Sequence, residues 1–327
     1  MEPRPPFAAR ALWLGLTVLV TAGMFRVFYE YHQNWQAIAD LTFGVVEGRP
    51  HWRAFQNRLL APFMAQGAHV LGLTRFDAVI AVTALLLLLH NLVLYALLRR
   101  AGEAPRAAFL WVLIFAFLFL VFQDHRWFLP WDAVEMVVVT LTAYVLYFGR
   151  PVVWLYPLFA VALFNRESAL FLALIIVACG ISLGDLTRLR LTVLDRRHVF
   201  GGAVLLVAGM ALTKALRDML FIESPIVGAD AANATFGNHF RLLENLREVF
   251  GTNLTDRNAL FTTLLILFLA VLLRGFRAAP EPKLRGTLFA LMFLAGVFAF
   301  GIFNETRMLV PLITVFIFHA ISPPKLL

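Results

Sequence analysis

The sequence of 327 residues is poor in cysteine, in charged residues and in the short motifs of common enzyme families. Cys179 is the only cysteine, which excludes an intrachain disulfide and a metal site built from cysteine ligands. Charged residues make up 15% of the chain, whereas soluble domains contain about 25%. There is no Walker A loop and no His-Glu-x-x-His, so nothing indicates a P-loop nucleotidase or a zincin protease.

Apolar residues are abundant: the chain is 61% hydrophobic, with a mean hydropathy of +0.80. This composition predicts an all-α, polytopic membrane protein, which we interpret as a single transmembrane domain over residues 1–327. The runs at 152–164 and 308–321 are short, so we expect those helices to tilt or to be buried among others. Apolar runs of about 17–25 residues predict about ten spans, near 11–29, 77–98, 107–123, 131–148, 152–164, 168–183, 199–218, 259–273, 286–303 and 308–321.

Basic residues outnumber acidic ones, 28 Lys and Arg against 20 Asp and Glu. Basic membrane loops explain this excess, and we expect no nucleic-acid partner. The positive-inside rule then places the short basic loops and both chain termini in the cytoplasm. The basic residues of these loops are Arg99, Arg100, Arg106, Arg150, Arg188, Arg190, Arg196, Arg197, Arg274, Arg277, Lys283, Arg285 and Lys325.

This orientation leaves two long segments outside, 30–76 and 219–258. Residues 57–73 of the first are apolar, but a crossing there would move Arg99 and Arg100 outside. We therefore expect a helix that lies in the outer interface or is re-entrant. In the second segment, residues 239–250 place apolar side chains on one helical stripe and charged ones opposite, which predicts another interfacial helix.

Short polar clusters interrupt the apolar runs, and under this topology all of them lie at outer ends of spans. Ionisable groups at membrane depth are costly, so they usually mark a site. The clusters contain Asp124, His125, Arg126, Asp132, Asn165, Arg166, Glu167, Asn304, Glu305 and Arg307. They either satisfy one another as ion pairs or line a substrate site, and we predict that they meet in one water-filled cavity. If that cavity is a lipid-phosphate site, its arginines should outnumber its carboxylates.

The first outer segment supplies three further candidates. Glu30 and Asp40 follow the first span, where a carboxylate is placed to act as a general base, although a solvated loop acid is the commoner explanation for either. Arg58 opens an apolar helix, so it either holds a phosphate beside the helix terminus or extends toward lipid headgroups.

This layout resembles the GT-C superfamily of membrane glycosyltransferases. The residues that carry the resemblance are 56–62, Trp131-Asp132, 165–168 and 304–307. The resemblance implies inverting sugar transfer from a polyprenyl-phosphate sugar to a lipid or envelope-glycan acceptor, on the periplasmic face of a bacterial inner membrane. It also implies Glu30 or Asp40 as the catalytic base, and the arginines with the other cluster residues as substrate-binding groups. No cofactor is demanded, although some members use a divalent metal.

The chain departs from the family in one respect, because the usual acidic pair after the first span is replaced by Tyr29-Glu30-Tyr31. That departure favours a second interpretation of the chain, as a non-catalytic subunit of a membrane complex with the same fold. A lipid or solute transporter is a third reading. It would require polar residues at mid-membrane depth and paired halves, and the sequence shows no repeat.

Overall fold

The computed structural model describes residues 7–31, 34–49, 58–123, 127–186, 188–220, 240–251, 257–274, 276, 279–301 and 306–322. Throughout these residues the chain is helical, and the only strand-like pairing is an isolated bridge between Ile181 and Val193. The longer elements are α1 (Phe7–Tyr31), α4 (Arg75–Arg100), α5 (Pro105–Phe122), α6 (Pro130–Tyr147), α10 (Arg196–Leu220), α13 (Arg257–Leu273) and α14 (Glu281–Phe300). The shorter ones are α2 (Trp35–Val46), α3 (Leu60–Val70), η2 (Val152–Trp154), α7 (Leu155–Leu163), α8 (Ala169–Cys179), α9 (Leu183–Leu186), α12 (Leu242–Gly251), η5 (Thr306–Leu309) and α15 (Val310–Ile321).

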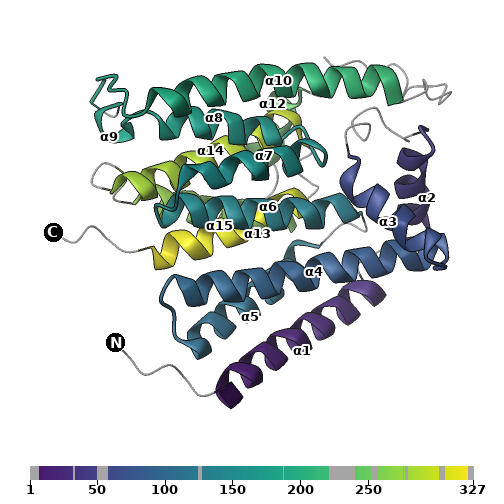
Figure 1. Cartoon of the computed structure of the whole chain (residues 1–327). Coiled ribbons are helices and arrows are strands. Elements are labelled where there is room, and N and C mark those ends of the chain that lie inside the picture. The colour runs from purple at the N-terminus through teal and green to yellow at the C-terminus, as the bar shows by residue number, and fades with distance from the viewer. Residues whose placement is uncertain are drawn as a thin grey trace.

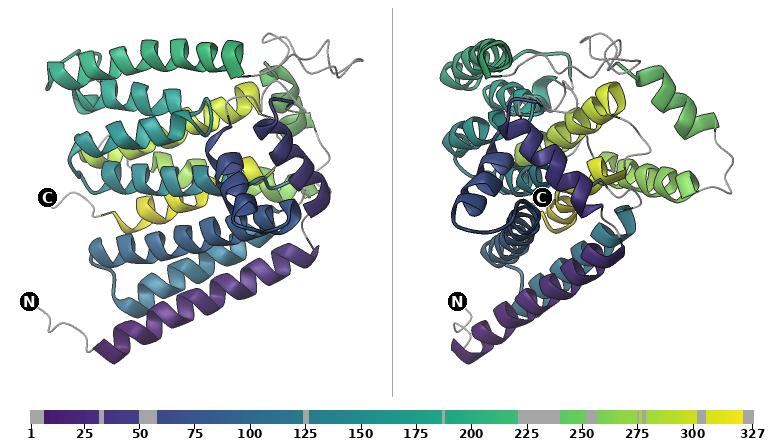
Figure 2. Two further views of the ribbon diagram at one scale, coloured as in Figure 1. Left: turned by 45° about the vertical axis from the view of Figure 1, so that its right-hand side comes forward. Right: turned by 90° about the vertical axis from the view of Figure 1, so that its right-hand side faces the viewer.

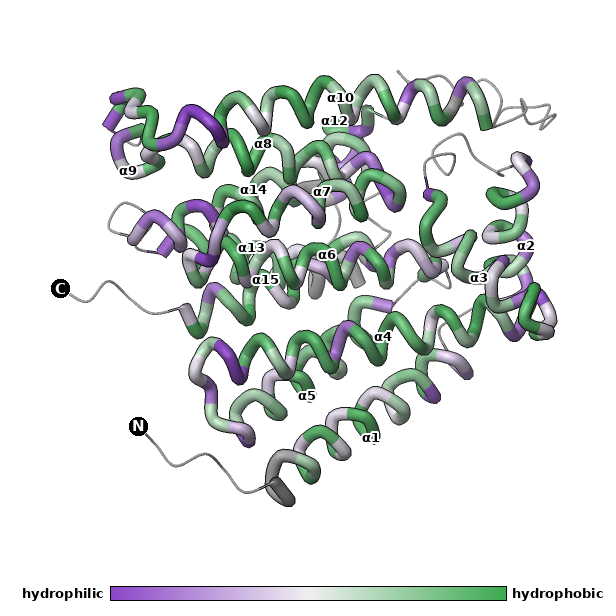
Figure 3. Tube along the Cα trace, viewed as in Figure 1, coloured by the Kyte–Doolittle hydropathy of each residue, from purple (hydrophilic) through white to green (hydrophobic). Residues whose placement is uncertain are grey.

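The prediction of an all-α fold is confirmed in the described residues. A helix occupies each predicted apolar run, and in the described residues five helices are long and apolar enough to cross a membrane. These five are α1, α4, α5, α10 and α14. Helix α6 is also long but is not one of these five, and it carries Asp132 and Glu135 in its first turns. Figure 3 shows apolar residues along the middles of the helices and polar ones toward their ends.

The helices lie side by side, with α2 and α3 across one end of the bundle (Figures 1 and 2). Helix α1 ends and α4 begins at that end, and α2 and α3 both contact α4. In its described part, the segment between α1 and α4 stays at this end and does not cross the bundle. This agrees with the expectation that residues 57–73 do not span the membrane. We call this end, where α1 ends and α4 begins, the α2–α3 end.

Helix α6 forms the centre of the bundle, because it contacts α3, α4, α7, α14 and α15 and nearly all of its residues are buried. Glycines permit the closest helix contacts. A Cβ at Gly202 of α10 would lie 2.7 Å from the backbone nitrogen of Val177 in α8, so these two backbones approach as closely as glycine allows.

Helix α12 forms within the second predicted outer segment and is docked on α14. The side-chain amide of Asn245 donates hydrogen bonds to the carbonyl oxygens of Phe298 (2.7 Å) and Gly301 (2.8 Å). These contacts cap the C-terminal end of α14, where helical carbonyl groups lack partners of their own. Most of the rest of 219–258 lies outside the described residues.

Candidate functional site

The candidate site is built around the first turn of α6, at the α2–α3 end of the bundle. Pro130 occupies the first helical position, where its missing N–H costs nothing. Asp132 accepts a hydrogen bond from the backbone N–H of Leu129 at 2.9 Å. Asp132 is only 4% exposed, and the N-terminal end of a helix favours its negative charge.

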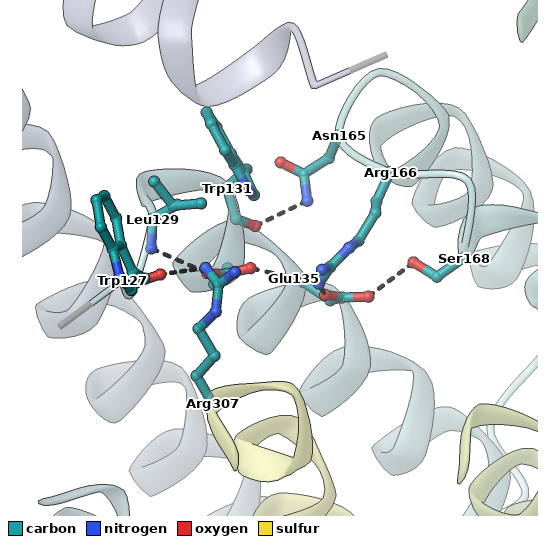
Figure 4. Close-up of polar contacts among 9 residues, drawn as sticks. Trp127, Leu129, Trp131, Glu135, Asn165, Arg166, Ser168 and Arg307 are labelled. Atoms are coloured by element: carbon teal, nitrogen blue, oxygen red, sulfur yellow. Dashed lines mark hydrogen bonds and ion pairs between the residues drawn. The ribbon is translucent and has the colours of Figure 1, made fainter. Parts of the chain in front are cut away.

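Two guanidinium groups from distant segments, those of Arg166 and Arg307 (labelled in Figure 4), meet the Asp132 carboxylate. Arg307 of η5 donates to Oδ2 at 2.8 Å, and Arg166 donates to Oδ1 at 3.3 Å. Arg307 also donates to the carbonyl oxygen of Trp127. Both arginines are buried, so each needs such partners to offset the loss of water.

Glu135, one turn further along α6, completes the pairing. Its carboxylate accepts from Arg166 and from the hydroxyl of Ser168, the latter at 2.7 Å. Asn165 precedes Arg166 in the turn between α7 and α8. Its side-chain amide donates a hydrogen bond to the carbonyl oxygen of Trp131 at 2.9 Å. The polar turn between α7 and α8 is thus fixed to α6 by three side chains.

Arg58 joins this group from the first outer segment. Its guanidinium lies over the Trp131 ring, 5.2 Å from the centroid, and the residue is 7% exposed. The backbone N–H groups of Leu59 and Leu60 donate to the carbonyl oxygen of Phe164 at 2.8 and 2.9 Å, which attaches the start of α3 to the polar turn. Burial lowers the pKa of Arg58, and the neighbouring charge of Arg166 adds to the effect.

The structure therefore brings together Arg58, Asp132, Asn165, Arg166 and Arg307, as predicted from the sequence. Glu167 adjoins them, because its charge acts on both Arg58 and Arg166. The predicted site residues Asp124, His125, Arg126, Asn304 and Glu305 lie outside the described residues.

Two details of the predicted site differ from the structure. An excess of arginine over carboxylate was expected, but in the described part Arg58, Arg166 and Arg307 face an equal number of acids, Glu167 and the two on α6. Glu135 is the additional acid. It lies inside an apolar run and was therefore not among the predicted site residues. The sequence did contain a signal, since residues three apart on a helix share a face.

The second difference is the size of the cavity. A water-filled cavity was expected, whereas the space among the described cluster residues has a volume of about 10 Å³, close to the minimum that holds one water molecule. Glu135, Asn165, Arg166 and Ser168 form its polar wall, and Phe289 and Phe293 are part of its apolar wall. Asn165 Oδ1 is buried and accepts no hydrogen bond from the described residues, so it is available to a water there.

The two carboxylates predicted as bases lie apart from these contacts. Glu30 is exposed and pairs with Arg26 on its own helix, and Asp40 is exposed and accepts a hydrogen bond from Gln36 at 3.3 Å. On α1 it is Phe28 that approaches the loop before α6, since its ring meets that of Phe128 edge-on at 5.5 Å. The catalytic roles of Glu30 and Asp40 therefore stay predictions.

A second polar network, which sequence reasoning missed, lies deep among the spans. His90 Nε2 is 3.0 Å from the hydroxyl of Thr140, which donates to the hydroxyl of Thr314 at 3.1 Å. The adjacent Asn91 donates to the hydroxyl of Thr21 at 2.9 Å. All five residues are buried, so hydrogen bonds that join α1, α4, α6 and α15 satisfy their polar atoms.

The sequence also contains a Gly-x-Ser-x-Gly pattern at 180–184, typical of serine hydrolases. That chemistry needs the serine on a turn from a strand into a helix, whereas here the pattern connects α8 to α9. Ser182 donates to Glu281 at 3.2 Å, so it serves a contact between helix ends.

No group of three or more His, Cys, Asp or Glu residues is placed to hold a metal ion within the described part of the chain. Comparison of the chain with protein-family models, with curated proteins and with solved structures finds no match. The interpretation of the site therefore rests on its own residues.

Proposed function

We propose that the protein is a membrane glycosyltransferase that takes a sugar from a polyprenyl-phosphate donor. The observation that supports this is the convergence of Arg58, Arg166 and Arg307, from three separate segments, around the start of α6. Buried guanidinium groups are the usual partners of phosphate, because their planar N–H donors match its oxygens. The acceptor is a lipid or an envelope glycan.

Each charged residue has a distinct role in this proposal. Asp132 and Glu135 hold Arg166 and Arg307 in place, so that the positive field is already oriented when charge develops on the leaving phosphate. Arg58, from the first outer segment, adds a third guanidinium over the Trp131 ring. Glu30 or Asp40 would accept the proton of the acceptor hydroxyl.

The proposal includes a topology. About ten spans, in a GT-C-like arrangement, would place the α2–α3 end on the periplasmic face of a bacterial inner membrane. Helix α1 begins and α15 ends at the opposite end of the bundle, which would be cytoplasmic (Figure 1). Helices α7, α8 and α15 would cross tilted or packed among longer neighbours.

A second candidate function, a non-catalytic subunit of a membrane complex, is favoured by two observations. The described charges of the cluster balance, and the cavity beside them holds about one water molecule. In that case the ion pairs serve only to join four segments of the chain. The deep position of the His90 network is the feature nearest to what a transporter requires, but it too is fully hydrogen-bonded.

Binding of polyprenyl phosphate to the purified full chain in lipid nanodiscs distinguishes these functions. We expect Arg58→Gln to weaken binding about tenfold or more, because it removes a charge-assisted contact at a buried site. Arg75→Gln is the matched control, since Arg75 is an exposed arginine near the same segment. Polyprenol without phosphate tests whether the phosphate is recognised.

The thermal stability of each variant is measured in parallel, and Arg58→Lys supplies a second variant that retains the charge. Equal binding of polyprenyl phosphate and polyprenol would refute the proposal. So would equal effects of Arg58→Gln and Arg75→Gln. Either outcome would favour the non-catalytic subunit.

A further inference from the structure

A groove of about 560 Å³ runs between α1 and α4, away from the polar cluster. The two helices lie side by side at an incline (Figures 1 and 2). Small residues, among them Ala22 on α1 and Ala84 on α4, line the groove and leave space between the two helices. A volume of several hundred Å³ is typical of sites for small molecules.

The groove has the length of one membrane leaflet. Its wall on α1 runs from Val18 to Tyr29 and its wall on α4 from Asp77 to Leu88. Eleven helical rises of 1.5 Å correspond to about 17 Å, and half of a bilayer's hydrocarbon core is about 15 Å. Both helices are long and apolar enough to cross a membrane, and in a bilayer this groove would face the acyl chains.

One end of the groove is polar, and its charges are mixed. Arg26, Tyr29 and Asp77 lie there, at the end of α1 and the start of α4. Arg26 also pairs with Glu30, and Asp77 adds a second carboxylate to this end of the groove. Asp77 accepts a hydrogen bond from the Thr74 hydroxyl at 2.6 Å and is exposed, so its carboxylate has room for a further donor.

This pattern of charge discriminates among lipid headgroups. A purely anionic headgroup would meet Arg26 favourably but would also meet two carboxylates. A headgroup with both a phosphate and a protonated amine matches the two signs. The amine carries N–H donors for a carboxylate, which a quaternary ammonium lacks.

We propose that the α1–α4 groove binds a zwitterionic aminophospholipid. One acyl chain lies in the groove between Ala22 and Ala84, the phosphate contacts Arg26, and the ammonium contacts Asp77. This site is separate from the arginine cluster, and the proposal does not depend on glycosyl transfer. The bound lipid fills a surface that α1 and α4 leave open toward the membrane.

Native mass spectrometry of the delipidated full chain, titrated with defined lipids, tests the proposal. Phosphatidylethanolamine should bind more tightly than phosphatidylglycerol or phosphatidylcholine. Ala22→Trp fills the groove and should weaken this binding about tenfold or more. The matched control is Leu19→Trp, which places the same tryptophan at an exposed position of α1 that does not line the groove.

A second variant keeps the test valid if Ala22→Trp misfolds. Asp77→Asn retains an acceptor for the Thr74 contact and should reduce the preference for phosphatidylethanolamine over phosphatidylglycerol about two- to fivefold, as exposed charge pairs do. Equal effects of Ala22→Trp and Leu19→Trp would overturn the proposal. A preference for phosphatidylglycerol or polyprenyl phosphate would replace the occupant by an anionic lipid.

A groove filled by a second copy of the chain is the remaining outcome, and it too would overturn the proposal. It would appear as a dimer that Ala22→Trp dissociates and that added lipid does not affect. Failure here is distinguishable from failure of the glycosyltransferase proposal. Arg58→Gln should change polyprenyl-phosphate binding alone, whereas Ala22→Trp should change aminophospholipid binding alone.

Discussion

The pairing of Asp132 with Arg307 predicts a strong energetic coupling between two residues 175 positions apart. Their side chains are each 6% exposed and approach to 2.8 Å. Removing one partner of a buried ion pair leaves the other uncompensated, at a cost of about 3–5 kcal/mol. We expect about 3 kcal/mol for Asp132→Asn, the low end, because Arg166 keeps Glu135 and asparagine still accepts from the Leu129 N–H.

The double variant Asp132→Asn/Arg307→Gln separates the interaction energy of the pair from the contacts that each residue makes with other groups. Arg307→Gln should also cost about 3 kcal/mol, since it removes the cation from the same carboxylate. If the two groups interact as the structure shows, the double variant should lose about 4 kcal/mol rather than about 6, a coupling of about 2 kcal/mol. Reversible unfolding in mixed detergent micelles, followed by tryptophan fluorescence, measures all four free energies.

The exposed pair of Glu47 and Arg75 provides the control, because its 2.7 Å contact differs from the buried pair mainly in exposure. Its coupling should be about 0.5 kcal/mol or less. Additive losses at Asp132 and Arg307, within about 0.5 kcal/mol, would show that the two residues are not paired in the folded protein. The organisation of the candidate site would then have to be abandoned.

Two further predictions concern topology and packing. In a cysteine-free background, Leu71→Cys at the α2–α3 end should react with a membrane-impermeant thiol reagent in intact cells and Glu103→Cys should not; labelling of the latter would refute the proposed orientation. Gly286→Ala should lower the free energy of unfolding by about 1–3 kcal/mol, because its Cβ would lie 2.5 Å from the Tyr147 ring. Gly23→Ala, where the added Cβ meets nothing within 4 Å, should leave stability unchanged or raise it by up to about 1 kcal/mol in the same unfolding assay, and equal losses would contradict this packing.

Much of the helical structure could be predicted from hydropathy alone. The run predicted at 107–123 corresponds to α5, Pro105–Phe122, and the one predicted at 77–98 corresponds to α4, Arg75–Arg100. The polar residues Asn165 and Arg166 were placed correctly in a turn between two helices. Such predictions succeed because a chain in lipid must satisfy its backbone groups internally, so each apolar run becomes a helix.

The candidate site was predictable only in part. The ends of the spans were expected to gather the charged residues, and Arg58, Asp132, Arg166 and Arg307 do lie together. Glu135 was missed, because an acid within an apolar run shows no partner until a second helix is placed beside it. The equal number of described acids and arginines in the cluster depended on that one residue.

The sequence by itself determined where helices form and that several of them are long and apolar enough to cross a membrane, since both follow from the local run of apolar side chains. Tertiary structure alone decided which polar groups meet. Asn91 bonds to Thr21, 70 residues away, and Thr140 to Thr314, 174 residues away. Hydrophobic periodicity does not encode such pairs, because lipid and protein surfaces are equally apolar and the register of helices depends on side-chain packing and hydrogen bonds between them.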